Sequence, residues 1–158
     1  MQEETIQQSL AGRFPALAGQ IRLQRSRRVW VEVPLELFHP VLDLCADSLD
    51  VNILLTITGL DEGEAFGVIY HMAGPGGIIV NLKIRLPKDG ASIRSLTPRF
   101  PSAEAYEREL KDLLGIEVTG LPEGPRYPLP DKWPDGQYPL RKDWKPDAAG
   151  SEEGGTHA

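Results

Sequence analysis

The sequence has few of the residues on which covalent cross-links and metal chemistry depend. Its 158 residues include one cysteine and three histidines. A single cysteine, Cys45, excludes an internal disulfide and a metal site made of cysteines alone. The histidines show none of the spacings that metal ligands usually have. The composition therefore disfavours both a disulfide scaffold and a metalloenzyme.

Long apolar runs and an excess of positive charge are also lacking. No apolar stretch approaches the roughly 18 residues of a membrane-spanning helix, and no N-terminal signal pattern is visible. The formal net charge of −6 argues against broad nucleic-acid binding, which usually shows a basic stripe. Four arginines do cluster in a predicted strand and turn: Arg22, Arg25, Arg27 and Arg28. We interpret this cluster as a solvated or partner-facing edge, and we expect a cytoplasmic protein without a nucleic-acid partner.

Motifs for nucleophilic catalysis or phosphate binding are missing as well. Neither Gly-x-Ser-x-Gly nor Gly-x-x-x-x-Gly-Lys occurs. The glycine-rich segment 74–77 lies between two predicted strands, so a hairpin turn is the better interpretation. The sequence therefore offers no catalytic residue that we would name.

The apolar residues that are present predict a folded core. They make up 41% of the chain, and its length predicts one domain. Helical periodicity predicts helices at residues 3–14, 34–49 and 102–115. Pro40 falls within the second pattern and leaves open that this helix starts later or bends. Alternating or continuous apolar runs predict strands at 20–24, 28–33, 51–58, 65–72, 78–86 and 92–96. This order predicts an α+β domain over residues 1–120, with one antiparallel or mixed sheet and helices on one face.

The last predicted helix separates its apolar residues from its charged ones. A buried stripe is expected from Tyr106, Leu110, Leu113 and Leu114. Ser102 is a candidate N-cap, and Gly115 a candidate C-terminal stop. The charged residues, Glu107, Arg108, Lys111 and Asp112, are expected to lie away from the stripe. Glu107 could pair with Lys111, and Arg108 with Asp112, because each pair is four residues apart. Such a charged face needs either water or a partner.

Residues 121–147 are expected to form an extended, partner-docking arm. The many prolines and the missing periodicity exclude a long helix or strand. The segment is too aromatic for a plain linker, since it carries Trp133, Tyr138 and Trp144. Trp, Tyr and Arg are the residue types that most often anchor protein interfaces. Residues 148–158, rich in Gly, Glu and Ser, are expected to be a disordered tail.

Two linked motifs carry a resemblance to a known family. The first is Glu107-Arg108-Glu109, followed by Asp112 and by Gly115-Ile116. The second comprises the segments 129–133 (Leu-Pro-Asp-Lys-Trp) and 139–144 (Pro-Leu-Arg-Lys-Asp-Trp). Over residues 3–145 the chain resembles the thirty-kilodalton subunit of respiratory NADH:quinone oxidoreductase (complex I). That family includes the equivalent subunit of energy-converting, membrane-bound [NiFe] hydrogenases.

The resemblance implies a scaffold without catalytic, cofactor or metal-binding residues. In that family the subunit docks on the large, quinone-site subunit and supports electron transfer; the equivalent hydrogenase subunit is the alternative. Fe–S clusters, quinone or NiFe are then expected in partner subunits, and contact with the membrane only through the complex, on its cytoplasmic side. The residues expected to bind partners are Glu107, Arg108, Glu109, Asp112, Trp133, Tyr138, Arg141, Lys142, Asp143 and Trp144. Two other hypotheses stay open: a stand-alone binding module, and a small enzyme with a cleft made of Tyr70, His71 and the acidic helix.

Overall fold

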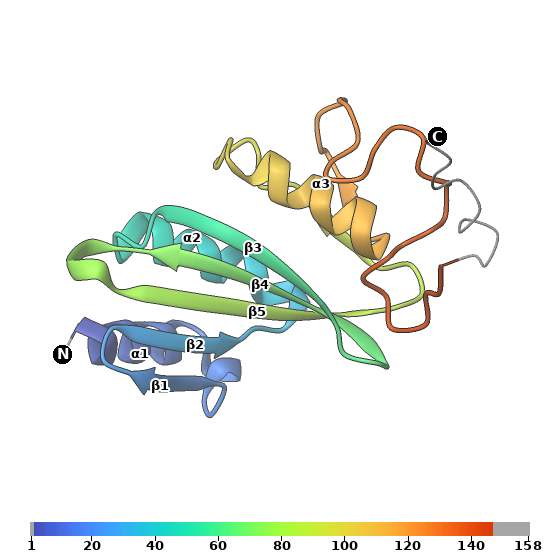
Figure 1. Cartoon of the computed structure of the whole chain (residues 1–158). Helices are drawn as coiled ribbons and strands as arrows, with labels where there is room; N and C mark the ends of the chain where they lie inside the picture. The colour runs from blue at the N-terminus through green and yellow to red at the C-terminus, as the bar shows by residue number, and fades with distance from the viewer. Residues whose placement is uncertain (1, 147–158) are drawn as a thin grey trace, which may run out of the picture.

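Five strands form a mixed sheet in the order β1-β2-β5-β4-β3 (Figure 1). The computed structural model describes residues 2–146 of the chain. The strands are β1 (Ile21–Arg25), β2 (Arg28–Glu32), β3 (Ile53–Asp61), β4 (Ala65–Ala73) and β5 (Ile79–Pro87). Strands β2 and β5 run parallel, and the other neighbours are antiparallel. The expected α+β fold with an antiparallel or mixed sheet is confirmed.

Helices α1 (Gln2–Arg13) and α2 (Phe38–Ser48) cover the apolar face of this sheet (Figure 1). Cross-strand register places the alternating apolar residues of β5 beside those of β2 and β4, for example Leu82 beside Val31 and Tyr70. All three are fully buried. Cys45 of α2 is buried in the same core, and burial raises the pKa of its thiol to about 12. The expectation of a buried, unpaired cysteine is therefore confirmed.

The second helix begins later than residue 34, which is one of the outcomes that Pro40 left open. Short 3-10 turns occupy Pro15–Leu17, Leu35–Leu37 and Pro75–Gly77. The second of these precedes α2, which starts at Phe38 rather than at residue 34. Pro40 thus falls in the first turn of α2, where a missing N–H breaks no intrahelical hydrogen bond.

A second, two-stranded sheet flanks the last helix. It pairs β6 (Ser92–Arg94) in parallel with β7 (Glu117–Thr119), and α3 (Ala103–Leu114) connects them. The sequence analysis missed β7, because three residues are too few to show alternation. Helix α3 packs against β3 at Gly59, where a Cβ would collide with Leu110 and Leu114. The missing side chain of Gly59 therefore lets the helix approach the sheet closely.

Residues 121–146 contain no helix or strand, as predicted, but they do not extend away from the domain. They loop back over α3 toward the turn between β3 and β4 (Figure 1). The backbone N–H of Leu140 donates to the carbonyl of Leu113, and that of Lys142 donates to Asp61. The predicted tail, 148–158, and residue 147 of the predicted arm lie outside the described residues.

Candidate partner-docking surface

Glu107, the first acidic residue of the Glu-Arg-Glu motif, points into the protein. Its side chain is fully buried, with 0% of its surface exposed. The Ser95 hydroxyl donates to Oε2 and the Leu96 backbone N–H donates to Oε1, both at 2.6 Å. Burial raises the pKa of Glu107, although these hydrogen bonds act in the opposite direction. Glu107 therefore fixes the chain between β6 and α3, and the expectation that it lies on an exposed charged face was wrong.

Arg108 connects α3 to the start of the arm. Its guanidinium pairs with Glu104 Oε1 at 2.8 Å, one helical turn earlier. It also donates to the backbone carbonyls of Pro122 and Pro125 at 2.7 and 3.3 Å. The predicted pair with Asp112 is absent from the ion pairs of the described chain, because Arg108 turns toward the N-terminal end of the helix. A charged group of the motif thus binds the chain itself.

Asp112 binds the middle of the arm through Arg126. Oδ1 of Asp112 lies 3.5 Å from Nε of Arg126, and Asp112 is buried. The same guanidinium donates to the backbone carbonyl of Trp133 at 2.7 Å. Oδ2 of Asp112 is buried and has no hydrogen-bond partner within the described chain. The expected exposed position of Asp112 was therefore wrong, and Arg126 supplies the cation that its carboxylate requires.

Gly115 ends α3 and leaves room for the second motif. It has φ of 71°, a conformation that glycine adopts at little cost. A Cβ at this position would lie 2.6 Å from the Tyr138 ring and 2.7 Å from the Arg141 guanidinium. Nε of Arg141 donates to the carbonyl of Leu114 at 2.7 Å, and its guanidinium lies over the Tyr138 ring. The two sequence motifs therefore meet at the C-terminal end of α3.

Asp61, at the end of β3, holds the next residue of the arm. Its Oδ2 accepts the backbone N–H of Lys142 at 2.9 Å, and Lys88 forms an ion pair with the carboxylate at 2.9 Å. Although partial burial acts in the opposite direction, hydrogen bonds from Lys88 and from the backbones of Lys142 and Gly63 lower the pKa of Asp61 to about 2. The carboxylate is therefore ionised at all physiological pH values.

Two tryptophans pack together at the outer end of the arm. The rings of Trp133 and Trp144 lie 6.0 Å apart, between centroids. Gln137 joins them: its backbone carbonyl accepts from Trp133 Nε1, and its side-chain Oε1 accepts from Trp144 Nε1. Both rings are half-buried against their own segment. The aromatic residues of the arm thus form a small folded cluster.

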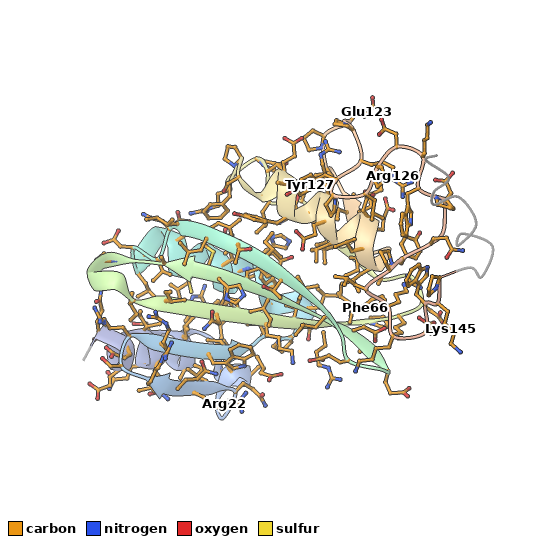
Figure 2. All side chains as sticks on the ribbon, viewed as in Figure 1. Arg22, Phe66, Glu123, Arg126, Tyr127 and Lys145 are labelled. Carbon is orange, nitrogen blue, oxygen red and sulfur yellow. The ribbon has the colours of Figure 1, made fainter. Side chains whose placement is uncertain are left out.

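Together, α3 and residues 121–146 form one unit, which we call the α3–arm unit. It contains all ten residues that the sequence analysis assigned to partner binding. Glu107 and Asp112 are buried in it, Lys142 and Asp143 are exposed, and the remaining six are intermediate. The largest exposed apolar side chains of the arm were not among the ten: Tyr127 is 48% exposed and Leu140 is 52% exposed. Figure 2 shows Tyr127 and Arg126 beside α3. Partner contact by the ten residues stays a prediction.

The structure does not bring the residues of the suggested enzyme cleft into one open site. Tyr70 is fully buried in the core, and no hydrogen-bond partner for its hydroxyl occurs among residues 2–146. His71 points to the opposite face of the sheet, where its ring nitrogens bond Thr58 and Asn81. Glu107 is enclosed by Ser95 and Leu96. No group of three or more His, Cys, Asp or Glu within the described residues could hold a metal ion. No helix among those residues is long and apolar enough to cross a membrane.

Comparison with known proteins places these features in a class. Residues 31–149 match the family described as the 30 kDa subunit of respiratory-chain NADH dehydrogenase. The chain is 31% identical over 148 residues to a subunit of the F420H2 dehydrogenase of Methanosarcina mazei, across 92% of this chain and 93% of that protein. It is 27% identical over 150 residues to the membrane-bound hydrogenase subunit beta of Pyrococcus furiosus, across 90% and 86%. It also resembles, with a TM-score of 0.82 and 25% identity, a chain of the membrane-bound sulfane sulfur reductase, an archaeal respiratory membrane complex, across 94% and 89%.

These similarities define a class of subunits that belong to respiratory and hydrogenase complexes. Within that class, the chain belongs to the family of the complex I 30 kDa subunit. The resemblance carried by the two motifs is thereby confirmed, and so is the role of an oxidoreductase-complex subunit.

Proposed function

We propose that the chain is a non-catalytic scaffold subunit that docks on the large subunit of its complex through the α3–arm unit. The observation that carries the proposal is the way α3 binds the arm. Arg108, Asp112 and Leu114 hold three separate points of the arm. An arm that is already ordered loses less conformational entropy on binding than a free one, so it suits a permanent interface.

The arm offers the residue types that anchor such an interface. Tyr127 and Leu140 expose large apolar surfaces, and exposed Lys142 and Asp143 lie next to the paired tryptophans. Interfaces of stable complexes have an apolar, aromatic centre and a polar rim. The proposed role is therefore mechanical: the subunit fixes its neighbours, and iron–sulfur subunits and the quinone or NiFe site belong to those neighbours. Its proposed location is the cytoplasmic side of the membrane, reached only through the complex.

The experiment is purification of the native complex through a tag on this chain, with identification of its largest partner. A large subunit with quinone-site or [NiFe] residues is expected. Leu140→Asp and Tyr127→Asp should reduce recovery of that subunit without lowering the melting temperature of the isolated chain. Ile53→Asp is the matched control, because Ile53 is 57% exposed on β3, outside the arm. Recovery of no large subunit with the wild-type chain would refute the proposal.

A hydrogenase complex is the second candidate. The similarity to the hydrogenase beta subunit of Pyrococcus furiosus over 90% of this chain supports it. The same purification distinguishes the two, because the large subunit of a hydrogenase carries the cysteine ligands of a NiFe centre and a quinone-site subunit does not.

A further inference from the structure

The face of the sheet turned away from α1 and α2, here called the outward face, carries most of the arginine cluster that the proposed function leaves unexplained. Strand register places five cations on it: Arg22, Arg25, Arg28, Lys83 and Arg85. Figure 2 shows Arg22 at the far side of the molecule from Arg126 and the arm. The outward face is therefore a second surface, separate from the α3–arm unit.

Two carboxylates neutralise only part of this charge. Glu32 pairs with Arg22 at 3.3 Å, and Glu62 pairs with Lys83 at 2.6 Å and with Arg85 at 3.2 Å. Arg25 and Arg28 form no ion pair within residues 2–146. The nearby Glu3 bonds the turn through the backbone N–H of Arg27. A chain with a net charge of −6 thus keeps two unneutralised arginines side by side.

Arg25 of β1 and Arg28 of β2 lie directly opposite each other in the strand pair. Like charges directly opposite each other destabilise a strand pair. Arg28 is held in place by the backbone carbonyls of Arg27 and Gly77, at 2.8 and 3.3 Å, so it cannot turn away freely. The fold therefore carries an electrostatic cost that a bound anionic group would remove.

The pair borders a hollow in the outward face. The hollow has a volume of about 390 Å³. It is lined by Gln24, Arg25, Arg28, Leu55, Thr56, His71, Ile79 and Asn81. Its floor is rigid, because His71 bonds Thr58 at 3.0 Å and Asn81 at 2.7 Å. Arg25 and Arg28 give the rim of this hollow a positive charge, which suits a short acidic segment.

We propose that this hollow receives an Asp or Glu side chain of a neighbouring protein subunit, bound between Arg25 and Arg28. Guanidinium groups bind carboxylates through two parallel hydrogen bonds, and a pair of arginines fixes the register of the segment that carries the carboxylate. The inference rests on the proposed subunit role and adds a second contact, on the face opposite α1 and α2.

The test uses the tagged full chain in its native complex. Arg28→Glu should change the melting temperature of the isolated chain little, because it replaces a repulsive pair by an attractive one but loses the hydrogen bonds to Arg27 and Gly77. The same variant should lower recovery of the partner subunits at least about fivefold, and the remaining recovery should fall less with added salt than that of the wild type. Arg94→Glu is the matched control, since Arg94 is exposed on β6 and forms no ion pair in the described chain. A loss of assembly without a loss of stability separates binding from folding.

A second measurement identifies the occupant. With Arg25→Lys, zero-length carbodiimide should join position 25 to an Asp or Glu of another subunit. Assembly of Arg28→Glu at the wild-type level would overturn the inference and leave the proposed function intact. The complex is also mixed with phosphatidylserine vesicles. If the wild-type chain leaves the complex and binds the vesicles while Arg28→Glu does not, the hollow binds lipid, and the inference of a protein carboxylate is overturned. Recovery of no large subunit with the wild type would remove both proposals.

Discussion

Oε1 of Glu107 accepts the backbone N–H of Leu96 at 2.6 Å, inside the protein. This hydrogen bond changes the interpretation of the Glu-Arg-Glu motif. Its first carboxylate fixes the loop before α3, and its arginine binds the arm after α3. The motif thus connects the domain to the arm.

The first prediction concerns Glu107. Glu107→Ala should destabilise the protein by about 2 kcal/mol, because the Leu96 N–H and the Ser95 hydroxyl lose a buried acceptor. Glu107→Gln retains an oxygen and should cost less. Urea unfolding followed by circular dichroism measures both. Equal stability of Glu107→Ala and the wild type would contradict the structural role.

Glu107 should also give a pH dependence with a defined sign. Burial raises its folded-state pKa above 4.5, so the folded protein holds this proton more tightly than the unfolded chain. Its contribution is complete below pH 4.5 and is lost as the pH rises through the folded pKa. The unfolding free energy of the wild type minus that of Glu107→Gln should therefore fall between pH 4.5 and neutral pH. A rise over this range would show that the hydrogen bonds outweigh burial.

The sequence predicted the elements well and the direction of their charged side chains poorly. The alternation of β5 and the stop at Gly115 follow from local physics, and both were confirmed. Glu107 looked exposed because carboxylates usually are. Its burial depends on Ser95 and Leu96, which reach it only after β6 and α3 pack. Spacing along one helix does not contain that information.

The partners of the arm were missed for the same reason. Arg126 lies 14 residues from Asp112 in sequence, and nothing local connects them. Asp61 ends β3, and its role as acceptor for the arm at Lys142 is likewise a long-range contact. The sequence contained one indication of these contacts, which is that residues after 116 are rich in both prolines and charged residues. Prolines prevent a helix or strand, so the backbone carbonyls of this segment need hydrogen-bond donors from side chains.

The second prediction tests how α3 meets the arm. Gly115→Ala should destabilise the protein, because the residue has positive φ and its Cβ would displace Tyr138 and Arg141. Gly136→Ala is the matched control: its φ is also positive, but no atom lies within 4 Å of its Cβ. Both changes should incur the backbone cost of about 1 kcal/mol, and only Gly115→Ala should incur the steric cost in addition. Equal losses in thermal unfolding would mean that the arm does not pack on Gly115.

The third prediction concerns the ion pair between Asp112 and Arg126, which holds the middle of the arm. Arg126→Ala leaves the Asp112 carboxylate buried without its cation, and frees the carbonyl of Trp133. The arm should detach locally while the sheet stays folded, so chymotrypsin should cleave after Leu140 and Trp144, which no proline follows, several times faster. Lys132→Ala, an exposed change in the same segment, should leave the cleavage rate unchanged. An unchanged rate for Arg126→Ala would show that the arm is held elsewhere.

The fourth prediction concerns Asp61, whose carboxylate joins the arm to the β3–β4 end. Its folded-state pKa of about 2 lies below the ordinary value of 3.8, so the folded protein favours the ionised form. The stability that this group contributes is present above pH 3.8 and is lost as the pH falls toward 2. Asp61→Asn should therefore be less stable than the wild type at pH 6, and the difference should shrink on acidification. Asp89→Asn, at an exposed site, should show no such convergence. Since Asp61 accepts the Lys142 N–H, amide exchange at Lys142 should accelerate in Asp61→Asn, and unchanged exchange there would show that Asp61 does not hold the arm.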